Sequence, residues 1–126
     1  MSLDFEQDLT AEECPVEAAV GLIGGKWKPA LLFHLMTGAK RYSELQRLIP
    51  KASDRMLTRS LRELEKDGLV NRKVFAEVPA RVQYSLTDDG ETLYPILTEI
   101  SRWRIQQKSR HQKPRHQKTG RQNSGQ

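Results

Sequence analysis

The segment Ser53–Gly68, with the sequence SDRMLTRSLRELEKDG, constrains the fold of this chain more than any other. Read as a helix at 100° per residue, it places three leucines on one face and three arginines on the opposite face. The leucines are Leu57, Leu61 and Leu64, and the arginines are Arg55, Arg59 and Arg62. One face can therefore pack on a hydrophobic core while the other meets an extended anionic partner.

Helix and strand signals surround this segment. Ser43-x-x-Gln46 reads as a capping box that starts a short helix, and Ser53 reads as the N-cap of the arginine-bearing helix. Pro95 should bend or offset the last helix. The expected helices are 14–23, 27–37, 43–49, 53–68 and about 88–107, and the expected strands are 69–77 and 81–86. This order predicts a mainly α fold with a small β-hairpin, a winged helix-turn-helix.

The net charge of +5 is distributed unevenly along the 126 residues. Residues 1–17 contain acids but no lysine or arginine, and residues 108–126 contain bases but no acid. Nine bases against two acids lie between Lys26 and Arg62, so the folded part itself is positive. We expect a flexible acidic arm over 1–13, a folded domain over 14–107 and a disordered basic tail over 108–126.

A short helix, a tight turn and a second helix form the arrangement in which the start of the second helix reaches base edges in the major groove of DNA. Arg55 and Arg59 could each contact guanine with two hydrogen bonds, and Asp54 could accept one from a cytosine amino group. Ser53 and Thr58 could bond either a phosphate or a base. These five residues are the predicted readers of double-stranded DNA.

A second group of basic residues suits contacts to the DNA backbone. Arg62 lies further along the same helix and is expected to meet phosphate. Lys40, Arg41 and Lys51 flank the two helices and would position the protein without reading sequence. Arg81, beside the hairpin turn, would lie on the wing, at the backbone or the minor groove.

Other classes of function receive little support. The sequence has no paired-carboxylate signature, Cys–His pairing with a third member, or glycine-rich phosphate loop, so we expect no enzyme and no cofactor. One cysteine and three histidines do not suggest a zinc site. No apolar run approaches the roughly 20 residues of a membrane span, and we expect a cytoplasmic protein. A winged-helix protein–protein module is the main alternative, although it would favour acidic or apolar residues at positions 55, 59 and 62. Non-specific nucleic-acid binding through the basic tail is a weaker one.

Several motifs in this order resemble the HxlR-type family of bacterial winged-helix transcriptional regulators. They are Cys14-Pro15, Gly24-Gly25-Lys26-Trp27, Arg41-Tyr42-Ser43-Glu44-Leu45, the segment 57–70 and the segment 78–90. The resemblance covers roughly residues 13–104. It implies a homodimer formed by the first and last helices, which binds palindromic operator DNA through the helix Ser53–Gly68 and the wing.

The same resemblance draws attention to Cys14, because some members of the family sense oxidants or electrophiles with a cysteine at the matching position. A helix N-terminus favours the thiolate, whereas the neighbouring Glu12 and Glu13 oppose ionisation. No second cysteine is present, so only a Cys14–Cys14 link between subunits, a mixed disulfide or alkylation could follow. A sensor and a plain helix-capping residue both remain open, and any small-molecule effector is unknown.

Overall fold

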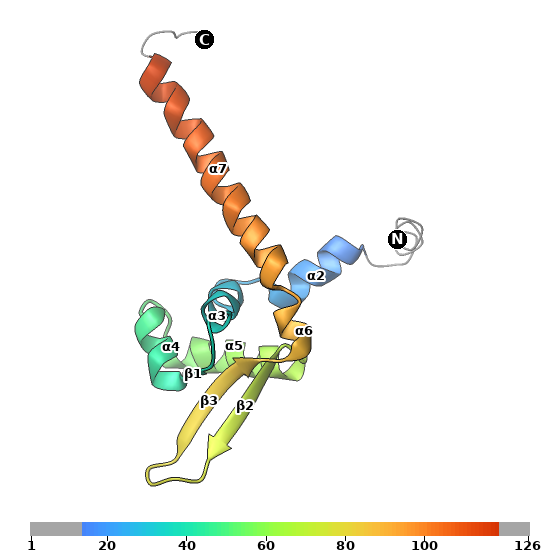
Figure 1. Cartoon of the computed structure of the whole chain (residues 1–126), viewed down its shortest axis with the longest axis vertical. Helices are drawn as coiled ribbons and strands as arrows, with labels where there is room; N and C mark the ends of the chain where they lie inside the picture. Colours follow the sequence, from blue (N-terminus) through green and yellow to red (C-terminus); the bar gives the residue numbers. More distant parts are fainter. Residues whose placement is uncertain (1–13, 119–126) are drawn as a thin grey trace. The chain divides into compact units, whose positions relative to one another are not determined.

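The computed structural model describes the backbone of residues 14–118 and side chains as far as residue 112. These residues form two compact units, one ending at Glu91 and the other beginning at Thr92. The first unit holds a helical part and a small sheet (Figure 1). Its elements are α2 (Pro15–Ile23), α3 (Lys28–Leu35), β1 (Lys40–Arg41), α4 (Tyr42–Leu48), α5 (Asp54–Lys66), β2 (Val70–Phe75), β3 (Arg81–Leu86) and α6 (Asp88–Glu91). The second holds α7 (Tyr94–Lys118). The predicted acidic arm, 1–13, lies outside the described residues.

Helices α4 and α5 form the helix-turn-helix. The Ser53 hydroxyl accepts a hydrogen bond from the Met56 amide at 3.2 Å, which confirms the predicted N-cap. Gly68 follows α5 with a φ of 79°, a left-handed conformation that favours glycine at a helix end. The capping box predicted at Ser43 is wrong. Helix α4 begins one residue earlier, at Tyr42, and the Glu44 carboxylate accepts from the Arg41 amide at 2.8 Å.

The sheet contains three antiparallel strands in the order β1-β3-β2. The hairpin of β2 and β3 was expected, with β2 shorter than predicted, and it extends away from α5 in Figure 1. Strand β1 was not expected, because a two-residue strand has no detectable periodicity. It pairs Lys40 with Tyr84 and Arg41 with Gln83. Strand β1 therefore attaches the start of α4 to the middle of β3.

Leucines from three helices fill the core of the first unit. The leucine face of α5 is buried as predicted, with at most 1% of each side chain exposed. Helix α5 packs against α3 and β2, and α3 in turn contacts α4 and β3, where Leu45 and Tyr84 are also buried. The buried leucines are Leu31, Leu32, Leu35, Leu45, Leu57, Leu61, Leu64 and Leu69. Burying one such side chain stabilises the fold by about 1.5–3 kcal/mol, so this cluster fixes α5 against the other helices.

The C-terminal helical region differs from the prediction in two respects. Thr87 caps α6 by accepting from the Gly90 amide at 2.9 Å, but the chain leaves the helix after Glu91 and α7 begins at Tyr94, next to Pro95. A proline is tolerated in a first turn and disrupts a helix interior, so the interruption follows from Pro95. Helix α7 then continues to Lys118 rather than ending near residue 107. Disorder was predicted from 108 onward; residues 108–118 are helical, and 119–126 lie outside the described residues.

Candidate nucleic-acid interface

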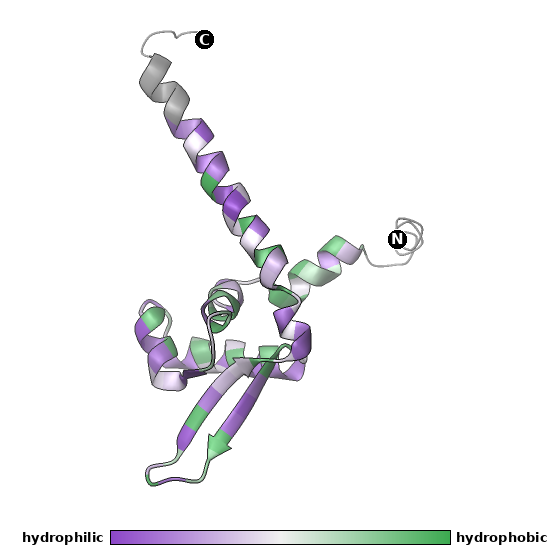
Figure 2. Ribbon diagram, viewed as in Figure 1, coloured by the Kyte–Doolittle hydropathy of each residue, from purple (hydrophilic) through white to green (hydrophobic). Residues whose placement is uncertain are grey.

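The three arginines of α5 lie on the exposed face of that helix, opposite the buried leucines. Figure 2 shows the alternation of hydrophilic and hydrophobic residues along this helix. The Arg59 side chain is 81% exposed, and Arg55 and Arg62 are also exposed. Within the described part of the chain, Arg55 and Arg62 make no hydrogen bond or ion pair. Their guanidinium groups are therefore available to an external partner.

The row of positive charge is longer than the sequence analysis proposed. Lys66, the last residue of α5, is exposed and lies four positions after Arg62. A separation of four residues keeps two side chains on one helix face. The same spacing rule would have identified Lys66 from the sequence.

The carboxylate of Glu63 forms ion pairs with both Lys28 and Arg59. The Lys28 ammonium lies 2.9 Å from the Glu63 carboxylate, and the other carboxylate oxygen lies 3.5 Å from Arg59 Nε. The hydrogen bond and charge of Lys28, with a further contribution from Arg59, lower the pKa of Glu63. Because Glu63 approaches Nε, the two terminal nitrogens of Arg59 remain free to form a paired contact.

Asp54 makes hydrogen bonds within the protein. Its carboxylate accepts hydrogen bonds from the Gln46 amide and, at 3.3 Å, from the Tyr42 hydroxyl, so it connects α5 to α4. The Tyr42 hydroxyl also lies 3.4 Å from the hydroxyl of Thr58. Burial, together with the charge of Asp54, raises the pKa of Tyr42. Asp54 and Thr58 thus have partners within the protein, whereas Ser53 is used as a cap.

The predicted backbone-contacting residues divide into exposed and engaged side chains. Lys51, in the turn between α4 and α5, and Arg41, in β1, are exposed. The Lys40 ammonium donates to the Thr37 hydroxyl at 2.9 Å and to the Gly38 carbonyl at 3.2 Å. Lys40 therefore stabilises the turn after α3. The charged groups of Arg41 and Lys51 are the more accessible to an external partner.

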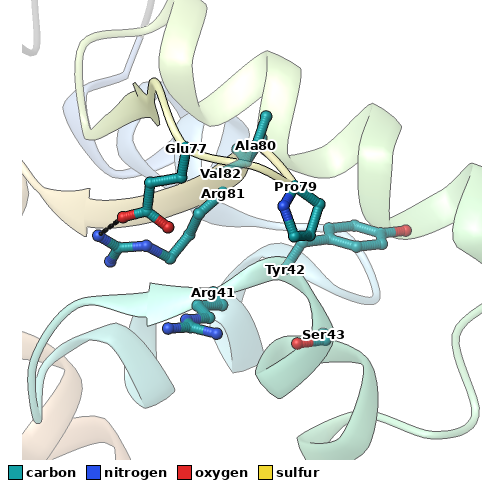
Figure 3. Close-up of a pocket in the computed structure, with 8 residues that line it drawn as sticks. All are labelled: Arg41, Tyr42, Ser43, Glu77, Pro79, Ala80, Arg81 and Val82. Carbon is teal, nitrogen blue, oxygen red and sulfur yellow. Dashed lines mark hydrogen bonds and ion pairs between the residues drawn. The ribbon is translucent and has the colours of Figure 1, made fainter.

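Arg81 is held by its neighbours on the hairpin. Its guanidinium donates to the Glu77 carboxylate at 2.9 Å and to the Gln83 side chain at 2.8 Å, and it lies 3.8 Å from the centre of the Phe75 ring. The pairing with Arg81 lowers the pKa of Glu77. Arg81 and Arg41 line a cavity of about 420 Å³ between the turn of the hairpin and the start of α4 (Figure 3). Arg81 therefore stabilises the turn of the hairpin, and its side chain is only 24% exposed.

Cys14 is the N-cap residue of α2, is half-buried and has a free thiol. The Cys14 side chain makes no cap hydrogen bond to the helix. Among the residues that the structure describes, no group of three histidine, cysteine, aspartate or glutamate side chains could hold a metal ion. No described helix is long and apolar enough to cross a membrane.

Comparison with known proteins shows which chains this one resembles. The family model of the HxlR-like helix-turn-helix matches residues 22–112. The uncharacterized HTH-type transcriptional regulator YdeP of Bacillus subtilis is 46% identical over 110 residues, covering 87% of this chain and 85% of YdeP. Another from B. subtilis, YybR, is 50% identical over 92 residues, or 73% and 74% of the two chains.

Solved structures show the same architecture. The redox regulator HypR in its reduced form aligns with a TM-score of 0.75 and 44% identity, over 79% of this chain and 98% of HypR. The putative HTH-type transcriptional regulator YtcD aligns with a TM-score of 0.74 and 45% identity, over 77% and 99% of the two chains. The mainly α fold with a small sheet is accordingly a winged helix-turn-helix, and these relatives are transcriptional regulators rather than enzymes.

Proposed function

Because this chain belongs to the HxlR-like helix-turn-helix family of transcriptional regulators, we propose that it is a homodimer that binds palindromic operator DNA in a sequence-specific manner. Helix α5 enters the major groove as the recognition helix, and the hairpin of β2 and β3 acts as the wing at the backbone or the minor groove. As a regulator of transcription it acts in the cytoplasm, without catalysis and without a cofactor.

The observation that carries this proposal is the row of exposed arginines on α5. A guanidinium group forms two parallel hydrogen bonds with the O6 and N7 atoms of guanine, the commonest specific contact in the major groove. Arg55 and Arg59, near the start of α5, are placed for such contacts, and Arg62 for a phosphate. Arg55 and Arg62 have no acidic partner among the described residues, so a protein partner that buried them would have to supply one.

The remaining predicted site residues take supporting roles in this proposal. Arg41 and Lys51 contact phosphates beside the recognition helix, and Lys40 adds positive charge while holding its turn. Asp54 is assigned a positioning role, because its carboxylate is already bonded by α4. Ser53 caps α5 and can still donate its hydroxyl hydrogen to DNA, whereas Thr58, whose hydroxyl is bonded to Tyr42, can accept a hydrogen bond from a base.

Exposed apolar side chains on the first and last helices support dimerisation. On α2, Val16 and Val20 are 60% and 57% exposed and lie one turn apart. On α7, Ile96, Ile100 and Trp103 are more than half exposed and recur at helical spacing. Apolar stripes of this kind are typical of an interface, and a two-fold interface would present two recognition helices to two half-sites of a palindrome.

Regulation by oxidants is a second proposal, which rests on Cys14 and on the likeness to the redox regulator HypR. The thiol lies at the N-terminus of α2, one of the two helices assigned to the dimer interface. A mixed disulfide, alkylation or a Cys14–Cys14 link would change the packing there, and with it the spacing of the two recognition helices, which DNA fixes near 34 Å.

Selection of bound fragments from a genomic DNA pool tests the main proposal. We expect the purified protein to enrich one palindromic sequence and to bind it in a gel shift as a dimer. Uniform binding to all duplexes would support non-specific attraction through the basic tail, whereas the absence of binding to any duplex would favour the protein–protein module.

A further inference from the structure

A cleft with polar walls lies between α5 and the hairpin. Its volume is about 360 Å³. The side chains lining it are Thr58, Arg62, Glu65, Arg72 and Tyr84, which come from α5, β2 and β3. Two of them are arginines from separate elements and one is a glutamate, so the positive charge of the two arginines exceeds the negative charge of Glu65.

The position of Arg72 follows from strand register. Arg72 pairs directly with Tyr84, and directly paired residues of an antiparallel sheet share one face. Tyr84 is 8% exposed and belongs to the core side of the sheet, so Arg72 lies on the side that faces α5. Lys73, the next residue, is on the opposite face, where its ammonium lies 5.0 Å from the Phe75 ring. Val70 and Arg72 are two positions apart on one strand and therefore share a face, and this spacing is the sequence signal for the placement of Arg72.

Neither Arg62 nor Arg72 has a hydrogen-bonding or ion-pairing partner among the residues that the structure describes, and both are exposed. Two guanidinium groups that line one cleft repel each other, and an anion between them removes that cost. A phosphate group suits this arrangement because its oxygens accept paired N–H bonds from arginine. The hydroxyl group of Tyr84, which lines the same cleft, adds a further donor, whereas the hydroxyl of Thr58 is bonded to Tyr42.

We propose that this cleft binds one phosphodiester group of the operator backbone, with Arg62 and Arg72 as its two ligands. The inference rests on the proposed function, because it takes α5 to lie in the major groove and the hairpin at the neighbouring minor groove. The sugar–phosphate strand that separates the two grooves then runs between these elements, along the cleft. Arg59, on the other flank of α5, is left to the bases.

A pair of variants with the same charge change tests the assignment. Arg72→Gln and Lys73→Gln each remove one positive charge from adjacent positions of β2. We expect Arg72→Gln to weaken operator binding about tenfold, equally for matched and mismatched operators, and to reduce the slope of log K against log salt by about 1. Lys73→Gln should have a much smaller effect on both. Thermal unfolding of each variant checks that the fold is retained.

Neutral methylphosphonate substitutions, scanned along the operator backbone, identify the phosphate. One position should weaken wild-type binding more than it weakens either Arg72→Gln or Arg62→Gln, and it should leave the double variant of both arginines unaffected. Equal effects of Arg72→Gln and Lys73→Gln, or no position with this coupling, would overturn the cleft while leaving operator binding intact. If the wild-type protein binds no duplex, the proposed function and this inference fail together.

Discussion

The ammonium group of Lys28 lies 2.9 Å from the carboxylate of Glu63 and joins the first turn of α3 to the C-terminal half of α5. The Lys28 side chain is 12% exposed and that of Glu63 is 46% exposed. The pair therefore has a lysine fixed by packing and a carboxylate that reaches the surface. Through its second oxygen, Glu63 connects this fixed point to Arg59.

Replacing Lys28 with methionine should raise the pKa of Glu63 toward the usual glutamate value of 4.5, because the main group that lowers it is removed. In the wild type, the folded-state pKa is the lower one, so the bridge favours folding above pH 4.5 and that contribution is lost as the pH falls through the lowered pKa. NMR titration of the Glu63 side-chain carbon measures the shift. Lys40→Met, which removes a lysine bonded to Thr37, is the control and should leave Glu63 unchanged.

Arg59→Ala should weaken operator binding by about 1–3 kcal/mol and relax the preference for one base pair, as expected for loss of a two-bond contact to guanine. A gel shift with the selected operator and single-base variants measures both. Arg102→Ala, which removes an equal charge from α7 where Arg102 pairs with Glu99, serves as the control. Unchanged selectivity in Arg59→Ala would argue against a base contact by this residue.

Tyr42 and Asp54 should be energetically coupled, because the Tyr42 hydroxyl donates to the Asp54 carboxylate across the turn of the helix-turn-helix. In a double-mutant cycle of Tyr42→Phe and Asp54→Ala, urea unfolding should give a coupling of about 0.5–1.5 kcal/mol. If Asp54 instead read a cytosine, its replacement would leave stability unchanged and alter base preference at one position.

Leu61→Ala should destabilise the fold by about 2–5 kcal/mol, because this side chain is 1% exposed and its removal leaves a cavity between α5 and the other helices. Met56→Ala is the matched comparison on the same helix, where the side chain is 49% exposed, and should cost much less. Chemical denaturation of both variants measures the difference. Similar losses would mean that α5 is not anchored through its leucine face.

Treatment with diamide or a quinone should change operator binding by the wild type and not by Cys14→Ser, if modification of this thiol alters the dimer. Gel shifts before and after treatment, followed by reduction, measure the response and its reversal. Non-reducing electrophoresis distinguishes a Cys14–Cys14 link from a mixed disulfide. An identical response in both proteins would exclude Cys14 as the trigger.

Local patterns in the sequence were enough to predict α5 and the helix-turn-helix order. The leucine spacing, the Ser53 cap and Gly68 each act within a few residues, so a single segment specifies a helix with one buried and one basic face. The hairpin strands followed from equally local rules, whereas Pro95, which was expected to bend one helix, follows an interruption between α6 and α7. The assignments of DNA-contacting residues remain predictions.

The tertiary structure decided what contacts between distant segments control. Strand β1 exists because Lys40 and Arg41 pair with residues more than 40 positions away in the sequence. Two residues are too few to show a periodicity from which this pairing could be predicted. The same long-range packing engages Asp54 with Tyr42, and it brings Arg72 into a cleft with Arg62. Sequence alone therefore determined which helix carries the basic face. Only the packing of α4 and the sheet against that helix determined which of its polar side chains are left free for a partner.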